Sequence, residues 1–166
     1  MLRVPRICLF AVTLAGLMWS HGVAQFKPSA TRNRLPDAAR AIVESADQIE
    51  ILPLEPALIR QPAKGDFYGY RVLGKKAITN PAIRKRLVSA LEKGIEENQG
   101  EIAACFNPRH GIHATRNGKF QDLVICFECR QVELYGQVEN RALVSHSPQH
   151  VFDEVLRDAG IQVADK

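Results

Sequence analysis

The chain has 166 residues and a formal net charge of +4, from 22 Lys and Arg against 18 Asp and Glu. A charge this small and this evenly spread gives no support for nucleic acid or an anionic membrane surface as a partner. The sequence shows no internal repeat and no low-complexity tract, and its length can bury the core of a single domain.

The first 24 residues have the pattern of a secretory signal peptide. Arg3 and Arg6 give a positive start, residues 7–19 are apolar but too few to span a bilayer, and small residues precede a cleavage point after Ala24. An uncleaved anchor is the alternative. We therefore expect a protein exported to the periplasm or beyond the cell.

Cleavage would change both the charge and the cysteine count. It would leave 20 basic against 18 acidic side chains, a formal charge of +2, and would remove Cys8. Cys8 lies at the start of the apolar run, whereas a lipoprotein signal needs a cysteine just after it, so we expect no lipid. Residues 25–36 are predicted to be a flexible leader, and 37–166 a single α+β domain without a membrane span.

Hydrophobic periodicity places the elements on either side of a central hairpin. Asn80 and Pro81 are typical of a helix start, and apolar residues then recur every three or four positions up to residue 98. The other predicted elements are a helix over 38–47 capped by Asp37, strands over 48–54, 66–73 and 141–145, and a last helix starting at Pro148 after Ser147 as its cap.

The hairpin itself is predicted from Asn117-Gly118, a dipeptide typical of a type I′ turn, between arms over 103–115 and 120–135. With this turn, facing residues have numbers that sum to 235. Pro108 cannot donate to a ladder, so we expect a break at Asn107-Pro108. The element order is then α-β-β-α-β-β-β-α. This order favours an α+β fold, with an antiparallel or mixed sheet of about five strands and two main helices on one face.

Three cysteines, Cys105, Cys126 and Cys129, lie in this hairpin. Across the ladder Cys105 comes within a residue or so of Cys129, so a disulfide between these two cysteines is predicted. The alternatives are a disulfide between Cys105 and Cys126, or three reduced, buried thiols. Cys126 and Cys129 have the C-x-x-C spacing of a metal site. In a continuous strand, however, positions i and i+3 point to opposite faces, so no metal is predicted.

The hairpin also supplies the candidate binding face, which consists of Arg109, His110, His113, Cys126 and Glu128. No nucleophile motif, zinc-protease motif or phosphate-cradling glycine loop is present, so no cofactor is predicted and a non-catalytic role is favoured. A cysteine enzyme is the weaker alternative, with Cys126 as nucleophile beside Arg109, His113 and Glu128. His110 and His113 would point to opposite faces of an extended arm. His110 is therefore interpreted first as a satisfied, partly buried histidine.

Four segments together resemble a family of small exported bacterial proteins that has no assigned activity. The segments are Tyr-Gly-Tyr-Arg-Val-Leu-Gly from residue 68, Cys-Phe-Asn-Pro-Arg-His-Gly-Ile from 105, Leu-Val-Ile-Cys-Phe-Glu-Cys from 123, and Pro-x-x-Val-Phe-Asp from 148. The resemblance implies export and a compact fold but no substrate. It also implies that the positions to test are Cys105, Pro108, Arg109, His110, Cys126, Glu128 and Cys129.

Two hypotheses about function follow. The first is a non-catalytic domain that binds an unknown protein or small molecule through the exposed face of the hairpin. The second is a thiol-redox or metal-binding protein that uses Cys105, Cys126 and Cys129.

Overall fold

The structure is a computed structural model that describes residues 34–58 and 63–164. The expected signal peptide and most of the expected leader lie outside these residues. Within the two described ranges, no helix combines the length and the hydropathy needed to cross a membrane.

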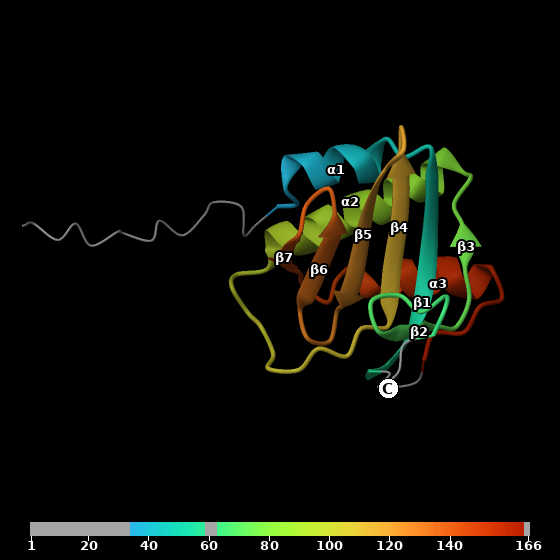
Figure 1. Cartoon of the computed structure of the whole chain (residues 1–166). Coiled ribbons are helices and arrows are strands. Elements are labelled where there is room, and N and C mark those ends of the chain that lie inside the picture. The colour runs from blue at the N-terminus through green and yellow to red at the C-terminus, as the bar shows by residue number, and fades with distance from the viewer. Residues whose placement is uncertain (1–33, 59–62, 165–166) are drawn as a thin grey trace, which may run out of the picture.

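Helices and strands in the described residues form an α+β domain, which confirms the predicted fold class (Figure 1). The helices are α1 (Asp37–Glu44), α2 (Pro81–Glu97) and α3 (Gln149–Asp158). The strands are β1 (Gln48–Leu58), β2 (Tyr70–Val72), β3 (Lys76–Ala77), β4 (His110–Arg116), β5 (Lys119–Cys126), β6 (Gln131–Gly136) and β7 (Asn140–Leu143).

All strand pairs in the described sheet are antiparallel, and their order is β2-β1-β4-β5-β6-β7, with the short β3 also paired to β1. The predicted number of about five strands is therefore too low. One addition is β3. The other arises because the return arm predicted over 120–135 is two strands, β5 and β6, separated by a turn over residues 127–130.

The register of the hairpin is as predicted. His110 pairs with Ile125, Ile112 with Leu123 and Arg116 with Lys119, so every pair sums to 235. Asn117 and Gly118 have φ angles of 50° and 73°, the left-handed conformations that a type I′ turn requires. The predicted break is also present, because β4 begins only at His110, two residues after Pro108.

All three helices lie on the same side of the sheet, behind it in Figure 1. Alternate strand residues such as Ile51, Ile112 and Leu123 are buried there against a stripe on α2. That stripe consists of Leu87, Val88, Leu91, Gly94 and Ile95. Apolar area removed from water on this face is the main driving force for folding, at about 25 cal/mol per Å².

The predicted N-cap residue is confirmed for one helix and wrong for the other two. In α2 the Asn80 side chain accepts a hydrogen bond of 2.8 Å from the backbone of Ala82, as predicted. Asp37 and Ser147 were wrongly predicted as caps. Asp37 is instead the first helical residue of α1, and the Ser147 hydroxyl donates to Glu97, so neither side chain caps a helix.

The opposite face of the sheet is covered by irregular chain instead of helices. Leu52, Leu54 and Val124 are buried there with Tyr70, and partly buried aromatic side chains, including Phe67 and Phe106, pack against them. These covering residues come from the segment that leads into β2 and from the loop that leads into β4. The second face of the hairpin is therefore largely covered.

Candidate functional site

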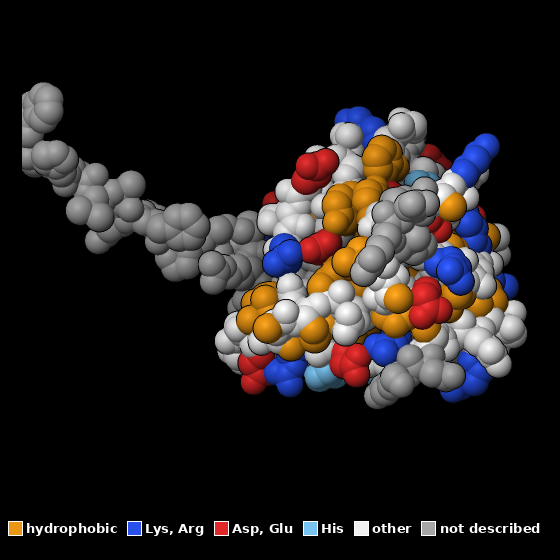
Figure 2. All heavy atoms as spheres, turned by 60° about the horizontal axis from the view of Figure 1, so that its bottom comes forward, with side chains coloured by type: hydrophobic (Ala, Val, Ile, Leu, Met, Phe, Trp, Pro, Cys, Tyr) orange, Lys and Arg blue, Asp and Glu red, His pale blue; other side chains and the backbone are white. Residues whose placement is uncertain are grey.

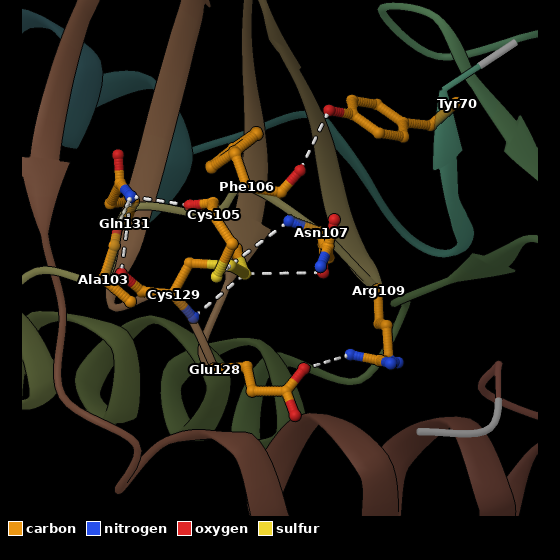
Figure 3. Close-up of a disulfide and its surroundings, with 10 residues drawn as sticks. Tyr70, Ala103, Cys105, Phe106, Asn107, Arg109, Glu128, Cys129 and Gln131 are labelled. Carbon is orange, nitrogen blue, oxygen red and sulfur yellow. Dashed lines mark hydrogen bonds and ion pairs between the residues drawn. A yellow bond between two sulfur atoms is a disulfide. The ribbon is translucent and has the colours of Figure 1, made fainter.

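Three sulfur atoms meet at the lower end of the sheet, where β5 ends and the loop before β4 passes underneath (Figure 3). Cys126 is the last residue of β5, Cys129 lies in the turn that follows, and Cys105 belongs to the loop. Figure 2 looks more directly at this end of the molecule, where hydrophobic side chains are interspersed with charges of both signs.

The turn over residues 127–130 decides how the cysteines are arranged. The backbone of Arg130 has a φ angle of 60°, and its N–H donates to the Phe127 carbonyl at 3.1 Å. The chain therefore reverses within four residues, and positions i and i+3 of this segment are on the same side. The prediction of a continuous strand, with the two cysteines on opposite faces, is therefore wrong for this segment.

Cys126 and Cys129 form a disulfide, with Cα atoms 5.2 Å apart. The Cys105–Cys129 bond that the sequence favoured is thus not the bond in the structure, and Cys105 is a free thiol. The physical reason is the turn, which brings Cys129 back to its near neighbour in sequence. The predicted proximity was nevertheless close to correct, because the Cys105 Sγ lies 3.1 Å from the Cys129 Sγ.

Exposure divides the three sulfur-bearing residues into two classes. Cys126 and Cys129 are 1% and 0% exposed, whereas Cys105 is an exposed residue. The disulfide is therefore covered by protein, and the one thiol in contact with it lies at the surface.

Backbone groups are directed at both sulfurs of the disulfide. The N–H of Cys129 donates to the Cys126 Sγ at 3.0 Å, and the N–H of Asn107 donates to the Cys129 Sγ at 3.2 Å. The carbonyl oxygen of Asn107 lies 3.4 Å from the Cys126 Sγ. Each bonded sulfur therefore has one backbone N–H donor, a kind of contact that stabilises negative charge on sulfur, and the Cys126 sulfur also faces a carbonyl oxygen.

Gln131 fixes the loop that carries Cys105. Its side-chain amide donates to the carbonyls of Ala103 at 2.9 Å and Cys105 at 3.0 Å, with a longer contact to the Cys129 carbonyl (Figure 3). Sequence reasoning missed this residue. A glutamine at a buried position of an alternating strand was the available signal, because a buried amide must find hydrogen-bond partners.

Of the predicted binding face, Arg109, His110 and Glu128 line one small pocket, whereas His113 pairs with Asp122 elsewhere on the sheet. Arg109 and Glu128 form an ion pair of 2.6 Å beside the turn. His110 faces the helices, where it is buried between aromatic rings with its Nε2 at 2.8 Å from Asp153. This arrangement confirms the interpretation of His110 as a satisfied histidine, while the binding role of the set stays a prediction.

His113 points to the other side of the sheet and belongs to a second polar group. Its Nδ1 lies 2.5 Å from one oxygen of Asp122, and the Tyr68 hydroxyl donates to the other oxygen at 2.8 Å. The Tyr68 ring stacks on Tyr135, with centroids 3.8 Å apart. This group fastens the segment before β2 onto the sheet, which is a structural use of the histidine.

In the described residues, no group of three or more His, Cys, Asp or Glu side chains is arranged to hold a metal ion. Comparison with known proteins adds no assignment: no family model, curated protein or solved structure matches this chain. The resemblance to an exported bacterial family thus stays a prediction.

Replacing Gln131 by Ala should loosen the Cys105 loop. The change removes two part-buried hydrogen bonds to the carbonyls of Ala103 and Cys105, and a hydrogen bond of this kind contributes about 0.5–1.5 kcal/mol. We expect a lower free energy of unfolding and faster alkylation of Cys105. Gln121→Ala is the matched control, because Gln121 is equally buried but donates to the carbonyls of Tyr135 and Val138. Equal alkylation rates in the two variants would contradict this role.

Alkaline pH should destabilise the segment held by Tyr68 and Tyr135. Burial, and then the hydrogen bond to Glu133, raise the pKa of Tyr135 to about 12. An unfolded tyrosine has a pKa of about 10, so between these values the folded state keeps a proton that the unfolded state has lost. Stability is therefore expected to fall as the pH rises through this window. Urea unfolding measured across it should show a weaker pH dependence in Tyr135→Phe, and an unchanged dependence would refute the assignment.

Proposed function

We propose that this protein is an exported thiol–disulfide exchange protein whose chemistry is carried by Cys105, Cys126 and Cys129. The observation that supports the proposal is the 3.1 Å separation between the free thiol sulfur of Cys105 and the Cys129 sulfur of a disulfide. Exchange proceeds by attack of a thiolate on a disulfide sulfur, so these groups are the reactants of that reaction, already in contact.

The net reaction is a transfer of two electrons and two protons. In one direction, two thiols of a partner become a disulfide while the Cys126–Cys129 bond is reduced to two thiols. In the other direction, the reduced pair converts a partner disulfide to two thiols. The partner class is therefore molecules that carry cysteine thiols or disulfides, either proteins or small peptides.

Two further features fit this function better than a purely structural disulfide. A structural disulfide needs no third cysteine beside it, whereas exchange needs a thiol in contact. Backbone N–H groups directed at both bonded sulfurs would also stabilise the thiolate that leaves when the bond is broken.

Catalysed reduction of a self-quenched fluorescent glutathione disulfide by dithiothreitol tests this function. The purified protein should accelerate the reaction, and Cys129→Ser should return the rate to that of buffer, because this change removes the bond that cycles. Cys8→Ser in the uncleaved chain is the matched control and should keep the wild-type rate. A wild-type protein no faster than buffer, or full activity in Cys129→Ser, would end the proposal.

Export has its own test. Expressed with its first 24 residues in a bacterium, the protein should accumulate outside the cytoplasm with an intact mass that corresponds to a start at Gln25. The same mass, measured without reductant, should be two hydrogens below that of the fully reduced chain, as one disulfide requires. Recovery of the full-length chain from the cytoplasm would contradict export.

A further inference from the structure

The proposed function leaves a physical question about access. The two bonded sulfurs belong to Cys126 and Cys129, which are 1% and 0% exposed, so a partner thiolate has no direct path to either of them. Cys105 is the exposed member of the cluster, but in the structure it is not part of the bond. A buried disulfide can react with a partner only if the bond first moves to the surface.

The geometry favours one route for that movement. The Cys105 Sγ is in contact with the Cys129 Sγ at 3.1 Å, so Cys129 is the sulfur placed for attack. Attack there makes Cys126 the leaving group. The Cys126 Sγ already accepts a hydrogen bond of 3.0 Å from the backbone N–H of Cys129, which is suited to stabilise the departing thiolate.

We propose that the disulfide exchanges internally between a Cys126–Cys129 form and a Cys105–Cys129 form, and that the second form is the one that meets the partner. The Cys105 thiolate attacks the Cys129 Sγ, a bond forms between these sulfurs, and the Cys129–Cys126 bond breaks. The electron pair leaves on Cys126, which takes up a proton equivalent to the one that Cys105 released. No external oxidant or reductant is consumed.

The second form is accommodated by groups that are already in place. As a thiol, Cys126 can donate its S–H to the carbonyl oxygen of Asn107, which lies 3.4 Å from the sulfur. Gln131 holds the Cys105 carbonyl at 3.0 Å and so keeps the loop beside the turn. The bond that results has one sulfur at an exposed residue, where a partner thiolate can attack Cys105 and displace Cys129.

This inference deepens the proposed function and depends on it for its biological meaning, but it makes a separate chemical claim. The exchange occurs within one molecule and in the absence of any partner. Cys105 is therefore the residue that forms the mixed disulfide with a partner, and Gln131 is a positioning residue that acts through the loop.

Mapping of the free cysteine tests the internal exchange. The oxidised protein is incubated without any other thiol, quenched in acid to stop exchange, denatured, and labelled with N-ethylmaleimide before peptide mass spectrometry. We expect label on both Cys105 and Cys126, in a ratio that does not change with protein concentration. Because the thiolate is the attacking species, the rate at which the labelling ratio reaches its final value should increase as the pH is raised. Label on Cys105 alone, at every pH, would overturn the proposal.

Four variants make the test decisive. Cys126→Ser should contain a Cys105–Cys129 disulfide, and free thiols at both positions would show that the loop cannot reach the bond. Cys105→Ser is the control, since it should retain the Cys126–Cys129 bond and show no label on either residue. In Gln131→Ala the share of label on Cys126 should fall, whereas Gln121→Ala should leave it unchanged.

The results for the two proposals can be told apart. If internal exchange is observed but the protein does not accelerate the reduction of glutathione disulfide, the proposed function is refuted and the proposal of internal exchange stands. Acceleration with label confined to Cys105 would support the proposed function and refute the internal exchange. Peptide mapping reports each cysteine separately, so the presence of Cys8 in an uncleaved chain does not affect either conclusion.

Discussion

Backbone hydrogen bonding in the central sheet stops at two neighbouring places, and the cysteine cluster is formed between them. On one side, Pro108 has no N–H to donate and β4 starts only at His110, although the Arg109 carbonyl still accepts from the backbone N–H of Leu54 at 3.0 Å. On the other side, β5 ends at Cys126 and the chain reverses over residues 127–130 before β6 begins. Both interruptions occur at the same end of the sheet, so the loop and the turn have to pack against each other.

Packing an irregular loop against a turn requires partners for its backbone groups, because a buried peptide group without one is costly. Buried amide side chains supply them. Gln131 donates to carbonyls of the loop, while the Asn98 side chain accepts from Gly100 and Glu101 and donates to the Val144 carbonyl. The position of the Cys105 sulfur thus depends on polar side chains that a hydrophobic pattern does not reveal.

The sheet also has two differently covered faces, and each of them holds one histidine–carboxylate pair. Helices cover one face, where His110 and Asp153 form a buried pair among aromatic rings. Short segments cover the other, where Asp122 holds both His113 and Tyr68. In both places the histidine is engaged by a carboxylate within the fold. The sulfurs differ from the histidines, because the free thiol of Cys105 lies against a disulfide.

Much of the fold could be predicted because local chemistry specifies it. Asn117-Gly118 requires a type I′ turn, and that turn fixes the register of β4 on β5. Asn80-Pro81 and the apolar stripe define α2, and the alternation of apolar and polar residues identifies the buried face of the hairpin. The number of strands was less predictable, since an alternating pattern is the same whether an arm is continuous or interrupted by a four-residue turn.

The sequence alone therefore determined the hairpin, its register and the gathering of three cysteines near its open end. Only the tertiary structure decided which two of them are bonded and which one is exposed. The physical reason is that the pairing depends on the left-handed backbone of Arg130 and on the hydrogen bonds that Gln131 makes to a distant loop. The first is a conformation that non-glycine residues adopt uncommonly, and the second is a long-range contact, so residue order and hydrophobic spacing specify neither.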